Sequence, residues 1–301
     1  MRRFRIYMLK YRGETPLIME TKGNRMADIT MARLHEAMVI LYAISLVFYF
    51  VDYLYTTKKA IRVAMSLLGA VWLLQTVFLV LYIVETQRFP VLTLFEGIYF
   101  YAWLLVTLSL VLRIFYRFDF AVFLINIIGF IFMVIHTFAP VQIERSPVGE
   151  ALVSELLFIH ITFAILSYAA FSLSFVFSAL HLLLYRLLKQ KKWTKQWSSL
   201  PSLGQTEQGM TISILVGIPM LFVSLVLGFQ WAIVSLEEFS LLDVKIVGSF
   251  ILLIVYSFIL WRHRRGNLNG MNYAWAHLYA FLLLLLNFFF GSRLSEFHFW
   301  Y

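Results

Sequence analysis

The sequence predicts an all-α protein, a polytopic membrane bundle of eight transmembrane helices. Hydrophobic residues make up 61% of the 301 residues and charged residues only 14%, whereas a soluble domain is about half apolar and about a quarter charged. The mean hydropathy is +0.82. Eight apolar segments are long enough to cross about 30 Å of hydrocarbon, and none shows the alternation of a membrane barrel strand.

The eight predicted spans follow one another along the chain and are separated by connections that carry most of the charge. They are residues 34–55, 60–84, 94–115, 120–138, 156–187, 211–234, 242–261 and 271–291. Two connections are long. We expect 137–155 to be external and 189–210 to be a flexible cytoplasmic linker, with partner docking there as the alternative.

Basic residues orient the bundle, because cytoplasmic loops are enriched in Lys and Arg. Thirteen lie in or at the edges of the connections after the first, third, fifth and seventh spans. The alternate connections hold only Arg88 and Arg145, and Arg293 alone lies in the C-terminal tail. The thirteen are Lys58, Lys59, Arg62, Arg113, Arg117, Arg186, Lys189, Lys191, Lys192, Lys195, Arg262, Arg264 and Arg265. Both termini are therefore predicted to be outside.

The first 25 residues conflict with this orientation, since they hold seven Lys/Arg and only two Glu. No apolar h-region follows their basic start, so they are not a signal peptide. Either natural translation starts at Met26 or the segment is a basic arm. We expect 26–301 to form a single eight-helix transmembrane domain. The overall charge of +9 then comes mostly from the cytoplasmic loops and from this segment. We therefore expect a lipid bilayer as partner and no nucleic acid.

The candidate functional residues are the histidines, because the chain has no cysteine. This absence excludes disulfides, iron–sulfur clusters and covalent haem attachment through cysteine. His35, His136, His160 and His298 fall toward the predicted outer face, and the others toward the inner face: His181, His263 and His277. Two imidazoles from separate helices can clamp a haem iron. The alternative is that each is an interfacial or hydrogen-bonded residue.

Acidic residues in the spans are few. Glu96 begins the third span, and Asp243 begins the seventh with Lys245. Asp243 is predicted either to cap that helix or to have a functional role. Because no nucleophile–base pair or phosphate-binding loop is present, we do not expect an enzyme.

Several motifs resemble the cytochrome c assembly family, the CcsA/CcmC/HemX group. The run SELLFIHITFAILSYAAF, which contains His160 and Tyr168, resembles that family's outer histidine and its Tyr-Ala-Ala. Four further elements occur in the family's order over residues 70–301: LFEG from Leu94, GFQWA from Gly228, and the closing NFF and EFHFWY segments.

The resemblance implies a non-covalent b-type haem. His160 and His298 match the external haem ligands of the family, and His263 matches a histidine that receives haem near the inner side. His136, His181 and His277 have no counterpart. The tryptophan-rich loop of the synthetase members is missing, and only an Asp243-x-Lys245 remnant persists beside two glutamates, Glu237 and Glu238.

The missing loop argues against synthetase activity and favours the regulatory branch of the group. This resemblance implies a bacterial plasma membrane protein that lowers glutamyl-tRNA reductase abundance, with the reductase or a membrane protease as cytoplasmic partner. One alternative is a subunit that transports or handles haem in cytochrome c maturation. The other is a non-catalytic membrane scaffold.

Overall fold

The computed structural model describes residues 16–116, 118–138, 155–191, 200–235, 240, 242–291 and 294–295. All regular structure in these residues is helical. The helices are α1 (Pro16–Tyr55), α2 (Lys58–Thr86), α3 (Leu94–Tyr116), α4 (Asp119–Phe138), α5 (Glu155–Lys189), α6 (Leu203–Ser235), α7 (Val244–Arg264) and α8 (Gly270–Leu286). Each is long and apolar enough to cross a membrane. The predicted fold class and number of spans are confirmed.

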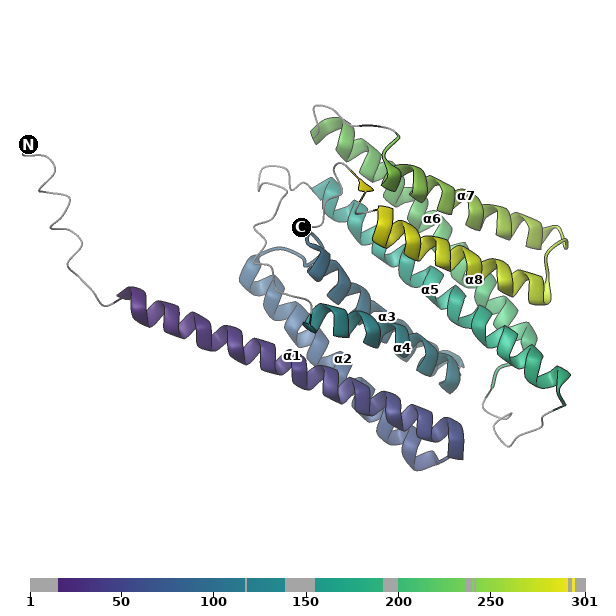
Figure 1. Ribbon diagram of the computed structural model, residues 1–301, viewed down its shortest axis with the longest axis horizontal. Helices are drawn as coiled ribbons and strands as arrows, with labels where there is room; N and C mark the ends of the chain where they lie inside the picture. The colour runs from purple at the N-terminus through teal and green to yellow at the C-terminus, as the bar shows by residue number, and fades with distance from the viewer. Residues whose placement is uncertain are drawn as a thin grey trace, which may run out of the picture.

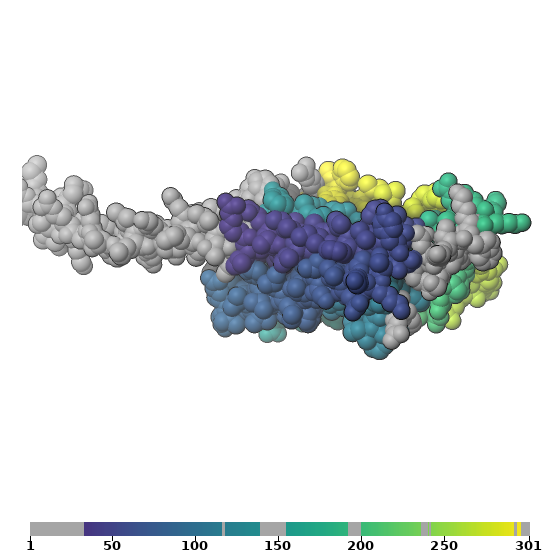
Figure 2. Space-filling view, turned by 90° about the horizontal axis from the view of Figure 1, so that it is seen from below, coloured from purple at the N-terminus to yellow at the C-terminus, as the bar shows by residue number. Residues whose placement is uncertain are grey.

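The helices form two groups of four that meet at α5. In Figure 1, α1–α4 lie together and α5–α8 form the second group, with α5 running between them. Helix α5 packs most extensively on α6 and also contacts α3, α4 and α8. Figure 2 shows α1 and α2 side by side along the face opposite α5–α8. Because α5 contacts α3 and α4 as well as α6 and α8, it connects the two groups.

The start of α6 differs from the prediction, because residues 203–210 are helical and not part of a flexible linker. Ser202 and Gln205 form a capping box. The Ser202 N–H donates to Gln205 Oε1 at 2.8 Å, and the Gln205 N–H donates to Ser202 Oγ at 3.2 Å. Such reciprocal bonds satisfy two donors at a helix start, so α6 begins eight residues before the predicted span and has 33 residues.

Close packing between α5 and α6 depends on glycines of α6 that face rings of α5. A Cβ atom at each glycine would lie within 2.7 Å of a ring atom, which real contacts do not allow. The pairs are Gly209 with Phe177, Gly217 with Phe171, and Gly228 with His160. Small residues at helix interfaces let helix backbones approach inside a membrane, and here they also provide room for the histidine.

Candidate functional site

A cavity of about 180 Å³ lies at one end of the second helix group. It is bounded by the beginnings of α3, α5 and α7 and by the final turns of α6 and α8. Most of its lining is aliphatic or aromatic, and the polar side chains that reach it come from four helices, α3, α5, α6 and α7. They are Tyr101, His160, Tyr168, Ser224, Lys245 and Ser249. An apolar cavity with a few convergent polar groups is typical of a ligand site.

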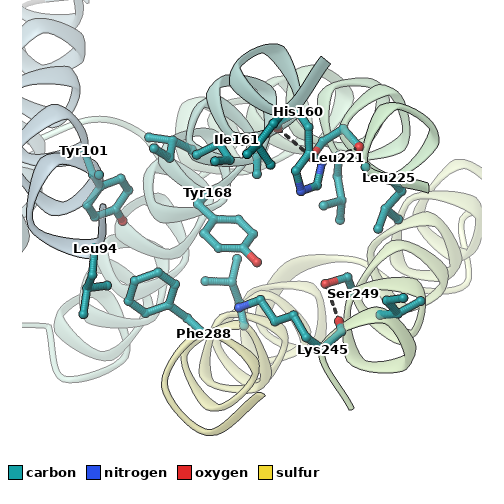
Figure 3. A pocket seen from close by; sticks show the side chains of 18 of the residues that line it. Leu94, Tyr101, His160, Ile161, Tyr168, Leu221, Leu225, Lys245, Ser249 and Phe288 are labelled. Carbon is teal, nitrogen blue, oxygen red and sulfur yellow. Dashed lines mark hydrogen bonds between the residues drawn. The ribbon is translucent and has the colours of Figure 1, made fainter. Parts of the chain in front are cut away.

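His160 enters the cavity from the second turn of α5 and is fixed by α6 (Figure 3). Its Nδ1 lies 2.6 Å from the Ser224 carbonyl oxygen. Ser224 Oγ lies 3.1 Å from the same nitrogen and donates to the His160 carbonyl at 3.0 Å. Because a carbonyl only accepts, Nδ1 carries the hydrogen, and in the neutral ring Nε2 holds the lone pair. A metal-ligating histidine is held by the same kind of contact.

Lys245 reaches the cavity from the opposite wall, in the first turn of α7 (Figure 3). Its Nζ donates to the Asn287 carbonyl at 3.2 Å and lies 5.4 Å from the centroid of the Phe288 ring. Both acceptors belong to η3 (Asn287–Gly291), a π-helical turn that follows α8. Turns of this kind occur often at functional sites.

The π turn packs tightly on α7. Asn287 Nδ2 donates to Ser249 Oγ at 3.2 Å, and its Oδ1 lies too close to Gly248 to leave room for a Cβ atom there. The Tyr168 hydroxyl interacts with the Asn287 and Ser249 side chains. These contacts connect α5, α7 and α8 around the floor of the cavity.

His263 lies at the other end of the same helix group, in the last turn of α7. Its Nδ1 lies 2.9 Å from the Leu268 carbonyl, its Nε2 is 3.4 Å from Thr211 Oγ1, and its ring stacks on Tyr273 with centroids 4.0 Å apart. A polar pocket of about 470 Å³ surrounds it, lined also by Glu207 and Arg264. His160 and His263 therefore belong to two separate sites.

The region that holds both sites has recognisable relatives. A family model described as Cytochrome C assembly protein matches residues 91–298. The chain belongs to the cytochrome c assembly family. Protein HemX of Bacillus subtilis (strain 168) is 48% identical over 273 residues, which cover 91% of this chain and 99% of the relative. Protein HemX of Brevibacillus brevis is 43% identical over 268 residues, covering 89% and 98%.

The part of the chain that matches the cytochrome c assembly family includes every residue that lines the cavity, from Leu92 to Phe288. Helices α1 and α2 lie before it. Four of the motifs that resemble the family meet at this cavity, through Gly97, His160, Gly228 and Phe288. His298, the second predicted external ligand, lies outside the described residues, as do Glu237 and Glu238.

His136 does not join His160, because it belongs to the first helix group. Its Nδ1 lies 3.0 Å from the Phe95 carbonyl, and its ring centroid is 5.5 Å from that of His35 and 5.0 Å from that of Tyr99. The outer histidines that the structure describes therefore lie in two places, with His35 and His136 in the first helix group and His160 at the cavity.

His181 and His277 are buried inside the second helix group. His181 Nδ1 lies 2.8 Å from Thr206 Oγ1, and His277 Nδ1 lies 2.5 Å from Ser174 Oγ. Both contacts join neighbouring helices. These histidines are consistent with hydrogen-bonded interior residues, and neither lines the cavity.

Glu96 and Asp243 both cap helices. Glu96 Oε2 accepts from the Thr93 N–H at 3.1 Å while its own N–H donates to Thr93 Oγ1 at 3.2 Å, and Arg88 forms an ion pair with it at 2.7 Å. Asp243 Oδ1 accepts from the N–H groups of Lys245 and Ile246. The capping alternative for Asp243 is confirmed, and Glu96 completes a capping box at the start of α3.

Sequence reasoning missed Ser224, Tyr101 and the contribution of Phe288 to the Lys245 site. Ser224 and Gly228 are four residues apart and so share one face of α6. A serine four residues before the glycine of GFQWA is a signal that could have identified the helix face that holds His160.

Proposed function

We propose that this HemX-like membrane protein binds haem at the His160 cavity and regulates haem biosynthesis by lowering glutamyl-tRNA reductase abundance. The observation that carries the proposal is the geometry of His160. Its Nδ1 is held at 2.6 Å by the Ser224 carbonyl, and its ring is accommodated by Gly228 at the edge of an apolar cavity. The family resemblance provides the link to haem and to the reductase.

The residues of the cavity suit a haem. His160 would supply the axial nitrogen, because its tautomer places the lone pair on Nε2. Tyr168, Phe288 and Trp231 provide aromatic walls, and the surrounding aliphatic side chains exclude water. When bound, haem would supply an iron centre for the histidine to ligate. The fraction of protein with haem bound would then follow the haem concentration. The chain itself would bind, orient and sense it without a catalytic step.

A response at the cytoplasmic face requires a connection across the membrane. Helices α5 and α6 provide it, because both line the cavity and both continue to the other end of the bundle. Helix α5 ends at Lys189 in the Lys-rich connection. In the predicted orientation this connection lies on the cytoplasmic side of the bacterial plasma membrane. The reductase or a membrane protease would bind there.

The test is a deletion strain of the host bacterium complemented with wild-type protein or His160→Ala. Immunoblots should show raised glutamyl-tRNA reductase in the deletion strain, restored by wild type but not by His160→Ala at equal membrane abundance. Unchanged reductase in the deletion strain would contradict the regulatory role.

A second candidate function is haem handling in cytochrome c maturation. The separate polar pocket at His263 favours it, because two sites at opposite ends of α5–α8 could serve uptake and delivery. Haem staining of c-type cytochromes in the same strains distinguishes the two. Loss of these cytochromes would support handling, and normal levels would contradict it. Normal reductase and normal cytochromes together would favour a scaffold.

A further inference from the structure

Lys245 occupies an unusual position for a lysine of a membrane protein. It lies in the first turn of α7, and its side chain lines the apolar cavity on the wall opposite His160, with the ammonium group next to Phe288 (Figure 3). The other basic residues of α7, Arg262 and Arg264, lie at the opposite end of the helix. An ionisable side chain in a spanning segment is costly and is therefore a candidate for function.

The surrounding groups hold this cation in place. Nζ donates to the Asn287 carbonyl at 3.2 Å and lies 5.4 Å from the Phe288 ring centroid. Asp243 contributes a favourable charge interaction, although its Oδ1 also accepts the N–H groups that cap α7. The π turn and the start of α7 together position the ammonium at the cavity.

The residues that line the cavity indicate the chemical class of its ligand. Most of the wall is apolar, which selects an apolar body, and a cation in such surroundings favours a ligand that brings an anion. The Tyr168 hydroxyl lies beside the Asn287 and Ser249 side chains and can also donate to an anion. The Ser249 hydroxyl donates to the Lys245 carbonyl at 2.8 Å. A carboxylate can accept several such hydrogen bonds.

We propose that Lys245 makes the cavity selective for apolar ligands that carry a carboxylate. For haem the carboxylates are the propionates, and this part rests on the function proposed above. A fatty acid of the bilayer has the same chemistry and is the other source.

The test uses detergent-purified full-length protein with two pairs of probes: haem and its dimethyl ester, and a fluorescent fatty acid and its methyl ester. Wild type should bind at least one acid about tenfold or more tightly than its ester, a difference of about 1.4 kcal/mol, because hydrogen bonds to charged groups contribute more than those between neutral groups. Lys245→Met should remove the preference and leave the affinity for the ester unchanged. Lys245→Arg, which keeps the charge, should retain it, as should the distant control Lys189→Met.

The outcomes separate the two proposals. If haem does not bind but the fatty acid shows a Lys245-dependent preference, the haem function fails and carboxylate recognition stands. If wild type shows no preference within either pair, the selectivity proposal is overturned whatever the variants do. The selectivity proposal is also overturned if Lys245→Met keeps the preference for the acid. A lower unfolding temperature of that variant would then show that Lys245 anchors the π turn.

Discussion

A Cβ atom added at Gly228 would lie 2.5 Å from Cε1 of the His160 imidazole. Two further ring atoms, Nδ1 and Nε2, would lie 2.6 and 3.1 Å from it. The ring is therefore confined between its own helix, the Ser224 carbonyl and the bare backbone of α6. Gly228 therefore limits where the imidazole can lie.

Gly228→Ala should displace the His160 ring and weaken haem binding by about tenfold or more, because contacts that orient a metal ligand are worth about 10–100-fold. The measurement is a haem titration followed by absorbance. Gly69→Ala is the matched control, since a Cβ atom there meets nothing within 4 Å. Gly217→Ala clashes with Phe171 instead, and should lower the unfolding temperature without a comparable loss of affinity in the folded fraction.

Ser224→Ala should have a much smaller effect on haem affinity than Gly228→Ala. The substitution removes the Oγ contacts at 3.1 and 3.0 Å but keeps the carbonyl that fixes Nδ1 at 2.6 Å. Single side-chain hydrogen bonds between membrane helices average about 0.6 kcal/mol, which corresponds to a change of about threefold. A loss as large as that of Gly228→Ala would show that the hydroxyl and not the carbonyl orients the ring.

Glu96→Ala should destabilise the protein by about 2 kcal/mol or more, because it leaves the partly buried Arg88 and the Thr93 N–H without their acceptor. Thermal unfolding in detergent measures the effect. Glu36→Ala is the control. It removes an exposed ion pair to Arg33 of 3.0 Å, and such pairs contribute at most about 1 kcal/mol. Equal unfolding temperatures for the two variants would contradict the capping role.

The predicted orientation can be tested with single cysteines, because the natural chain has none. Glu85 lies near the end of α2, and Asn267 lies in the connection between α7 and α8; both are exposed. In intact cells a membrane-impermeant thiol reagent should label Glu85→Cys but not Asn267→Cys, and after permeabilisation it should label both. The reverse pattern would invert the topology.

The eight spans were predictable because long apolar segments in a bilayer must satisfy their backbone hydrogen bonds internally, which leaves helices. The ends of α6 and α8 were less predictable. The Ser202–Gln205 capping box extends α6 into a stretch that composition alone assigns to a linker. The π turn after α8 depends on the packing of Asn287 against Gly248, which no local pattern reveals.

The candidate site was predicted in part. The resemblance identified His160, but its partner Ser224 is 64 residues away in the chain. Lys245 and Asn287 are 42 residues apart. Contacts over such separations follow from helix packing, and therefore the sequence could not show that His136 joins His35 and not His160.

The most direct test of the account is a haem titration of wild type and His160→Ala. His181→Ala provides the control, since His181 lies on the same helix but contacts Thr206 away from the cavity. Wild type and His181→Ala should both give a saturable shift of the haem Soret band, and His160→Ala should bind at least about tenfold more weakly. Equal binding by wild type and His160→Ala, or no saturable binding by wild type, would contradict the account.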